Sequence, residues 1–208
     1  MSDIQIIGFP QSTYVRAVRM AAEEKGVSYE LVPEPPHSDA VNAIHPFGKI
    51  PVMRHGDVNL CESRAIAGYI DRNFDGPVLF PRDLAAEIDQ WVSIVNTAIY
   101  PTLIRGYLLS YIFPKGANGE PDRAAIDALL PDVDKQLGIL ESAIATSGQL
   151  AGDRFTYADI NILPILSYLQ TMPESSARIG SSSTLSDYYE RHAERASFQN
   201  TIPPAPEA

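Results

Sequence analysis

Three short segments of the chain carry side chains that could hold and activate a small polar ligand. They are FPQST at residues 9–13, GKIP at residues 48–51 and CESR at residues 61–64. Each lies where an apolar run typical of a strand meets a turn or the start of a helical pattern. Because α/β proteins tend to bind ligands at the ends of their strands, the three segments are candidates for one shared site.

Ser12 stands between a β-branched run and a run of helical periodicity. A helix start offers free backbone N–H groups and a partial positive charge, which stabilise an anion such as a thiolate or a carboxylate. The Ser12 hydroxyl can donate a further hydrogen bond to that anion. The alternative interpretation is that Ser12 or Thr13 only caps the helix.

Lys49, Ile50 and Pro51 lead into a second apolar run. A proline at the start of a strand is often cis, and a bend there would expose the backbone of Ile50 to a peptide-like ligand that pairs as an extra strand. Lys49 could contact a carboxylate of that ligand. The alternative is an ordinary edge-strand proline beside a solvated lysine.

Glu62 and Ser63 follow the last strand-like run and precede a helical pattern. A serine at a helix start can hold a carboxylate with its hydroxyl and backbone N–H, while Glu62 could accept from an ammonium group. The alternative makes Ser63 a plain N-cap and Glu62 a favourable charge in the first turn. Cys61 is expected to face the core as a small apolar residue.

The elements that would position these segments alternate between strand and helix. Strands are expected at residues 4–7, 27–32, 50–53 and 58–60, and helices from residue 13 to the glycine at 26, near 39–43 and at 63–74. A crossover helix makes the first two strands parallel, and a tight turn makes the last two antiparallel. The pattern predicts an α/β domain with a mixed four-stranded sheet and helices packed against it.

No convincing strand appears after residue 82. Helices are expected at residues 84–109 (kinked near Pro101 or Gly106), 122–145, 156–172 and 185–196. The predicted organisation is an α/β domain at residues 1–75, a linker at 76–82 and an all-α helical bundle domain at 83–208. A loose proline-rich tail at residues 203–206 is expected to end the chain.

Composition narrows the possible partners. The 208 residues include 26 acidic and 16 basic side chains, for a net charge of −10, so nucleic acid and anionic membrane surfaces are poor partners. Residues 1–82 hold eight basic and ten acidic side chains, so a small anionic ligand is better received there than in the acidic remainder. A single cysteine, four scattered histidines and the lack of a long apolar run suggest a cytosolic protein without a metal site or a membrane span.

Taken together, the three segments offer an anion stabiliser, a strand-like backbone edge, a lysine, and a carboxylate beside a serine. A ligand with a thiolate, a peptide backbone, two carboxylates and an ammonium group would satisfy all of them. Glutathione has these groups.

The same segments resemble motifs of the cytosolic glutathione transferases. FPQST is similar to the strand–helix junction of serine-type, theta/phi-like bacterial classes, PFGKIP (46–51) to the loop that ends in a cis-proline, and LCESRAI (60–66) to the γ-glutamyl-binding motif. TYADI (156–160) resembles the structural capping box of the helical domain. In this motif the Thr156 side chain would cap the helix, and the Asp159 side chain would bond back to the Thr156 backbone. Two features depart from the family: His45 stands where an asparagine is usual, and residues 33–43 lack a lysine.

The resemblance implies a thioredoxin-like N-terminal domain and a transferase that conjugates glutathione, as co-substrate and without a metal, to a small hydrophobic electrophile, typically in detoxification. Ser12 would donate a hydrogen bond to the sulfur, with Tyr14 as the runner-up donor. Glutathione would be held by Lys49, Ile50, Pro51, Glu62 and Ser63, with His37 a weak substitute for the missing lysine.

The resemblance also implies a cytoplasmic homodimer. The aromatic and apolar side chains of Tyr107, Leu108, Tyr111 and Phe113 could line the cleft for the second substrate, but core packing or a dimer surface explains them equally well. A non-catalytic binding or scaffold protein of this family and a glutathione-dependent isomerase are the alternative functions.

Overall fold

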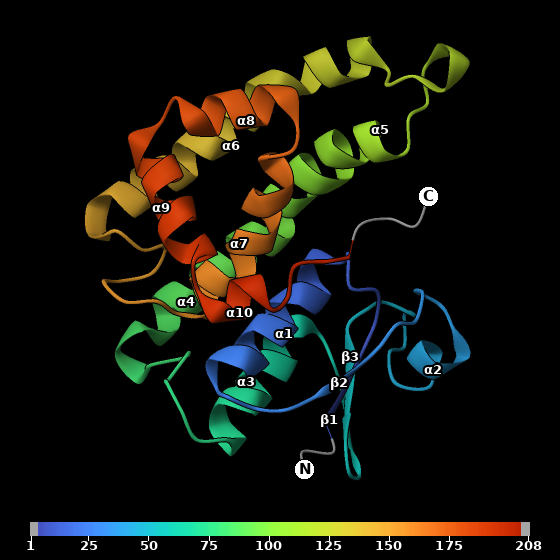
Figure 1. Cartoon of the computed structure of the whole chain (residues 1–208), viewed down its shortest axis with the longest axis vertical. Coiled ribbons are helices and arrows are strands. Elements are labelled where there is room, and N and C mark those ends of the chain that lie inside the picture. Colours follow the sequence, from blue (N-terminus) through green and yellow to red (C-terminus); the bar gives the residue numbers. More distant parts are fainter. Residues whose placement is uncertain (1–3, 205–208) are drawn as a thin grey trace. The chain divides into compact units, whose positions relative to one another are not determined.

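The computed structural model describes residues 4–204, which fall into two compact units (Figure 1). The first unit comprises the chain up to Arg82 together with the segment from Ala193 on, and the second comprises Asp83–His192. The helical pattern predicts that everything after residue 82 belongs to the helical domain, whereas residues from Ala193 on belong to the first unit. The end of the expected tail, residues 205 and 206, lies outside the described residues.

The first unit is built on a sheet in the order β2-β1-β3-β4, so the predicted mixed four-stranded sheet is confirmed. Its strands are β1 (Ile4–Ile7), β2 (Glu30–Val32), β3 (Val52–His55) and β4 (Val58–Cys61). The crossover helix α1 (Thr13–Glu24) makes β1 parallel to β2, while β3 is antiparallel to both β1 and β4. β2 is shorter than predicted, because Val27 precedes the ladder and packs into the core instead.

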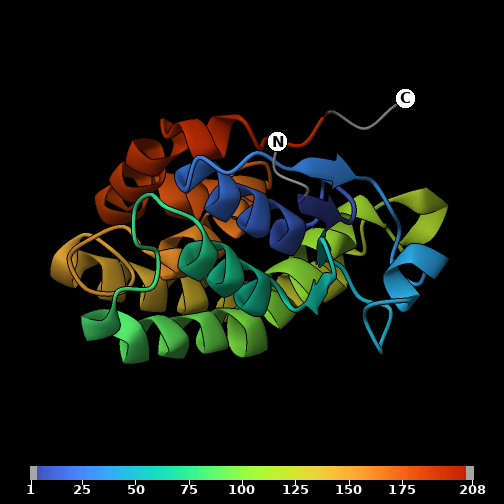
Figure 2. The ribbon, with the colours of Figure 1, turned by 90° about the horizontal axis from the view of Figure 1, so that it is seen from below.

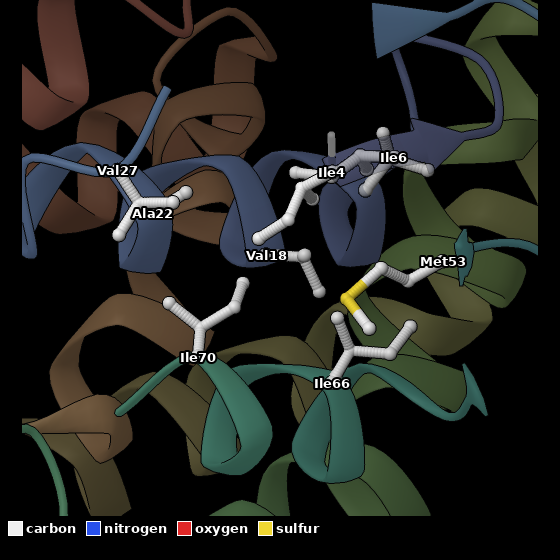
Figure 3. Packing of buried hydrophobic residues seen from close by; sticks show 9 residues of the cluster. Ile4, Ile6, Val18, Ala22, Val27, Met53, Ile66 and Ile70 are labelled. Carbon is white, nitrogen blue, oxygen red and sulfur yellow. The ribbon is translucent and has the colours of Figure 1, made fainter. Parts of the chain in front are cut away.

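Helices α1 and α3 (Ser63–Asn73) lie side by side against one face of this sheet (Figures 1 and 2). Ile4 and Ile6 of β1 and Met53 of β3 point into the space between the sheet and the helices (Figure 3). The fully buried side chains there include Ile4, Ile6, Val18, Met53, Ile66 and Ile70. Since burying each such side chain contributes about 1.5–3 kcal/mol, this core fixes the strands and both helix starts as one body.

The opposite face of the sheet carries a smaller cluster. Ile7, Val52 and Val41 are buried together there, and Val41 belongs to the short helix α2 (Asp39–Asn42). The two clusters alternate along β1, as the two-residue period of a strand requires.

The C-terminal helix α10 (Ala196–Gln199) packs on α1 within the first unit. Arg16 donates to the Phe198 carbonyl at 3.2 Å and lies over the Phe198 ring, and Arg19 donates to the Asn200 carbonyl at 3.2 Å. Both arginines are almost completely buried. Their contacts explain why this segment belongs with α1, although its helical pattern continues that of the preceding domain.

The second unit begins with a long helical run. α4 (Ala85–Ile94) passes through π-helical turns at Val95–Ile99 (η2) and Pro101–Leu108 (η3) and ends in α5 (Leu109–Ile112). Pro101 has no backbone N–H and cannot make the normal α-helical hydrogen bond, so wider turns at this point are physically reasonable. The expected irregularity of the helix at Pro101 is therefore a stretch of π-helix.

The remaining helices of the second unit largely match the predicted ones. They are α6 (Arg123–Ser147), α7 (Tyr157–Leu169) and α9 (Ser183–Ala193), with short 3-10 turns at Arg82–Leu84 (η1), between the units, and Ala117–Gly119 (η4). α8 (Pro173–Gly180) is a helix that the sequence analysis missed. Its signals were Pro173 in the first turn and the acidic Glu174 beside it.

Asp159 holds the start of the buried helix α7. Its carboxylate accepts from the Thr156 N–H at 2.9 Å, and the Thr156 hydroxyl accepts from the Ala158 N–H, so the predicted capping box is confirmed. Asp159 also accepts from the Leu150 N–H and from the Tyr188 hydroxyl, each at 2.8 Å. Burial and this nearby carboxylate raise the pKa of Tyr188 well above its ordinary value, so the phenol keeps the proton that it donates.

Glu174 of α8 accepts hydrogen bonds from side chains of three other helical segments, η3, α5 and α6. The Tyr107 and Tyr111 hydroxyls donate to its Oε2 atom at 2.8 and 2.6 Å, and Arg123 donates to Oε1. Although desolvation opposes it, these hydrogen bonds from Tyr111, Arg123 and Tyr107 lower the pKa of Glu174 to about 2. Desolvation and the bond to Glu174 raise the pKa of Tyr111 to about 12.

This cluster predicts a pH-dependent contribution to stability. The folded-state pKa of Glu174 is below the ordinary value of 4.5, so its contribution is complete above pH 4.5 and is lost as the pH falls towards 2. We expect Glu174→Gln to lower the Tm by roughly 3–6 °C at pH 7, with the difference vanishing at pH 2. Thermal melts across this range test it, with Asp127→Asn, which alters only an exposed partner of Arg123, as the control. A Tm difference that does not change with pH would contradict the prediction.

Candidate active site

The register of the sheet brings the three predicted segments to one edge. Ile7, the last residue of β1, pairs with Val52, the first residue of β3, and Val52 pairs with Cys61, the last residue of β4. The chain therefore leaves or enters the sheet at the same end in all three segments. Since adjacent strands lie about 4.8 Å apart, the outer two segments start about 10 Å from each other, roughly the length of an extended tripeptide.

Gly8 allows the first two of these segments to approach closely. Its φ of +147° lies in a region that glycine favours. A Cβ atom at this position would clash with Val15 Cγ2 at 2.7 Å and would make a tight contact with Ile50 Cβ at 3.0 Å. The missing side chain thus lets the start of α1 and the loop before β3 pack against the same point.

Ser12 is the N-cap of α1 and is half-buried. Its Oγ accepts from the Val15 N–H at 3.4 Å, so Ser12 caps the helix. That distance is long for a hydrogen bond, and an accepting hydroxyl still has its own proton to donate. Ser12 can therefore cap the helix and donate to an anion at the same time. Both interactions take place at the positive end of α1.

The loop before β3 contains a cis peptide bond between Ile50 and Pro51, as the sequence suggested. Pro51 is buried and the ladder begins only at the next residue, Val52. Lys49 is exposed. His37 lies next to this loop, because its N–H donates to the Gly48 carbonyl at 2.8 Å.

Glu62, not Ser63, is the N-cap of α3, so the alternative interpretation of Ser63 as the N-cap is wrong. Glu62 has a φ of +71°, which is uncommon for a residue with a side chain, and it makes no side-chain capping bond. Such conformations cost about 1–3 kcal/mol and cluster at functional sites. The Glu62 side chain is 69% exposed, while Ser63 is buried in the first turn of α3.

The structure adds His45, whose role the sequence analysis left open. His45 is only 3% exposed, and its Nε2 atom lies 3.3 Å from Glu62 Oε1. One signal for His45 was its departure from the asparagine that the motif usually has at this position. Its contact with a residue 17 positions later depends on the sheet register and was not visible in the sequence.

Two of the residues suggested for the second-substrate cleft have other partners. Tyr107 is fully buried, and both Tyr107 and Tyr111 donate to Glu174, so they serve the packing of the helical unit. Phe113, at 64% exposed, is accessible. Within residues 4–204 no group of three or more His, Cys, Asp or Glu side chains is placed to hold a metal ion. Among the same residues, no helix is long and apolar enough to cross a membrane.

Both parts of the chain match models of known families. Residues 6–78 match the glutathione S-transferase N-terminal domain, and residues 90–196 match the glutathione S-transferase C-terminal domain. Among curated proteins, the chain is 33% identical over 195 residues to glutathione S-transferase 1 of Triticum aestivum, covering 83% of this chain and 82% of the wheat protein. It is 30% identical over 216 residues to glutathione S-transferase 3 of Zea mays, covering 99% and 96%.

Solved structures show the same similarity. Glutathione S-transferase I from maize, in complex with an atrazine glutathione conjugate, superposes with a TM-score of 0.84 at 27% identity. The match covers 96% of this chain and 96% of the maize chain.

Proposed function

The chain belongs to the glutathione S-transferase family, and on this premise we propose that its first unit binds glutathione across the ends of β1, β3 and β4 and activates the thiol beside Ser12. The protein is a glutathione transferase with a thioredoxin-like first domain, and glutathione is its co-substrate. What remains to be assigned is the part that each residue plays.

The sheet register is the observation that carries this assignment. It supports a bound tripeptide that spans about 10 Å, with the sulfur at Ser12 and the γ-glutamyl end at Glu62 and Ser63. The middle of the tripeptide would pair with the backbone of Ile50, which lies in the loop beside Pro51 and outside the ladder, in the way that an added strand pairs with backbone. Lys49 would contact a ligand carboxylate.

The chemistry follows from the groups at the start of α1. A free thiol has a pKa of about 8.5, so only a few per cent is thiolate at neutral pH. A hydrogen bond from Ser12 and the N–H groups of the first turn favour the thiolate. A lowering of about 2 pKa units corresponds to about 2.7 kcal/mol. The thiolate then forms a sulfur–carbon bond to the electrophile, whose leaving group departs with its bonding electrons, and the thiol proton passes to solvent.

A binding assay and a rate assay test this function together. Calorimetry with glutathione is expected to give a saturable heat, and a chlorodinitrobenzene-type substrate is expected to be conjugated with glutathione-dependent kinetics. Binding without turnover across a broad panel of electrophiles would contradict the transferase assignment and favour a scaffold protein. We propose small hydrophobic electrophiles as second substrates, supported by the atrazine conjugate bound to the maize relative.

The subclass we propose is the serine-containing phi type. Its support is the set of plant relatives, which include proteins named F10 and F11 of Arabidopsis thaliana, together with Ser12 at the start of α1. A specifically bacterial class has no support among these relatives. The single cysteine agrees with a cytoplasmic location, which we propose as well.

We propose that the protein is a homodimer in which Phe47 is buried by the partner. Phe47 is 71% exposed, unusually high for a phenylalanine, and a two-fold interface would bury it twice. We expect a dimer at micromolar concentration in analytical ultracentrifugation, and at least tenfold weaker association for Phe47→Ser, since burying a phenylalanine is worth about 1.5–3 kcal/mol. Val78→Ser, which removes another exposed apolar side chain, is the control. A monomeric wild type, or an unchanged Phe47→Ser dimer, would contradict this proposal.

A further inference from the structure

His45 connects the loop before β3 with the start of α3. Its Nδ1 atom accepts the Phe47 N–H at 3.0 Å, and its carbonyl accepts the Gly48 N–H at 3.0 Å, so the ring is fixed within the turn that leads to Pro51. Its Nε2 atom, on the other side of the ring, lies 3.3 Å from Glu62 Oε1. The buried His45 side chain therefore contacts two segments of the proposed glutathione site: the loop that would bind the peptide backbone and the start of α3 that would bind the γ-glutamyl end.

The hydrogen bond from Phe47 determines which ring nitrogen carries the proton. In a neutral imidazole one nitrogen donates and the other accepts. Since Nδ1 accepts from a backbone N–H, the proton is on Nε2 and faces the Glu62 carboxylate. The ring thus offers a donor of fixed direction to Oε1.

Glu62 needs such a partner because little else restrains its carboxylate. Its side chain is 69% exposed and makes no capping bond to α3, while its backbone is held at a φ of +71°. A freely rotating carboxylate would lose side-chain entropy on binding a ligand, and a fixed one has already lost it.

We propose that His45 is a positioning residue, which holds one oxygen of Glu62 so that the carboxylate is preorganised to accept the α-ammonium group of glutathione. This proposal rests on the function proposed above. His45 does not contact the ligand in this arrangement; its effect passes through Glu62. Its removal should therefore weaken recognition of the ammonium group and raise the KM for glutathione. The rate of the chemical step at Ser12 should not change.

His45→Asn separates the two contacts of the ring. The asparagine amide oxygen occupies the place of Nδ1 and can still accept from Phe47, but its nitrogen ends one bond short of Nε2 and cannot reach Glu62. His55→Asn is the matched control, because His55 also lies in the first unit but pairs with Ile4 at the opposite end of the sheet. Melting temperatures would verify that each variant is folded.

The readout is the preference for glutathione over an analogue that lacks only the α-amino group, measured as a ratio of kcat/KM values. We expect His45→Asn to reduce this preference roughly tenfold, with the loss in KM, and His55→Asn to retain it. Glu62→Gln should reduce the preference at least as much, and His45→Asn should have no further effect in the Glu62→Gln background.

Two results would overturn the proposal. One is an unchanged preference in His45→Asn, and the other is a multiplicative loss in the double variant, because His45 would then act independently of Glu62. Failure of the proposed function has a different signature. In that case the wild-type protein itself would neither bind glutathione nor prefer it to the analogue.

Discussion

Replacing Ser12 by alanine is expected to lower kcat/KM for conjugation roughly 30- to 100-fold at pH 6, with a loss that shrinks to a few-fold near pH 8.5. The wild-type site is expected to hold the thiol about 2 pKa units below its free value, and the variant returns most of that shift. The deficit therefore follows the difference in thiolate fraction, which is largest well below the free pKa. At pH 6, below the pKa of the bound thiol, glutathione affinity is expected to stay nearly intact, because the backbone and γ-glutamyl contacts remain.

The Ser12→Ala variant also loses an N-cap bond, and the chain offers a matched control for that loss. Ser38 caps α2 in the same way, since its Oγ accepts from the Val41 N–H at 3.4 Å, the distance found at Ser12. Ser38→Ala should therefore reproduce the small stability cost of a lost cap without the pH-dependent rate loss. Ser12→Thr keeps both cap and hydroxyl, and Tyr14→Phe removes the other candidate donor. A pH-independent deficit in Ser12→Ala, or the larger rate loss in Tyr14→Phe, would contradict the role of Ser12.

Replacing Asp159 by alanine is expected to cost about 3–5 kcal/mol of folding free energy, the largest stability effect we predict. The change leaves the N–H groups of Leu150 and Thr156 and the Tyr188 hydroxyl without their acceptor inside a fully buried site. For a chain of this length the cost corresponds to a Tm lower by roughly 8–15 °C. Thermal and denaturant unfolding measure it directly.

Two further variants show whether the loss comes from this network. Asp132→Ala removes an exposed carboxylate from α6 and should change stability by less than about 0.5 kcal/mol. Tyr188→Phe should cost about 1 kcal/mol in the wild type and almost nothing once Asp159 is absent, because the two residues share one hydrogen bond. Additive losses in the double variant would show that the network does not explain the effect.

Much of the fold could be predicted because local signals and tertiary packing agree. The strand at residues 4–7, the glycine that ends α1 and the capping box at Thr156 and Asp159 are each determined by residues a few positions apart. α8 was missed because its eight residues bury little beyond Ser175 and Ile179, which leaves a weak periodic pattern. The placement of α10 on α1 depends on Arg16 and Arg19, whose partners lie 182 and 181 residues later in the chain, and no local pattern indicates it.

In the candidate site as well, local features could be predicted from the sequence and long-range contacts could not. Ser12, Pro51 and Glu62 are proposed as site residues from their positions at the ends of apolar runs. The contact between His45 and Glu62 could not be predicted, because it requires the register that pairs β1 with β3 and β3 with β4. The positive φ of Glu62 was also hidden, since a glutamate before a helix normally suggests a first-turn charge and not a left-handed backbone.

The most direct test of thiol activation at Ser12 is a titration of the thiol while glutathione is bound. Ultraviolet difference spectra of the complex report the thiolate as the pH is raised, both for the wild type and for Ser12→Ala. We expect the bound thiol of the wild type to have a pKa of about 6.5, and that of the variant to lie close to the free value of about 8.5. A wild-type complex whose thiol titrates like free glutathione would contradict the central claim.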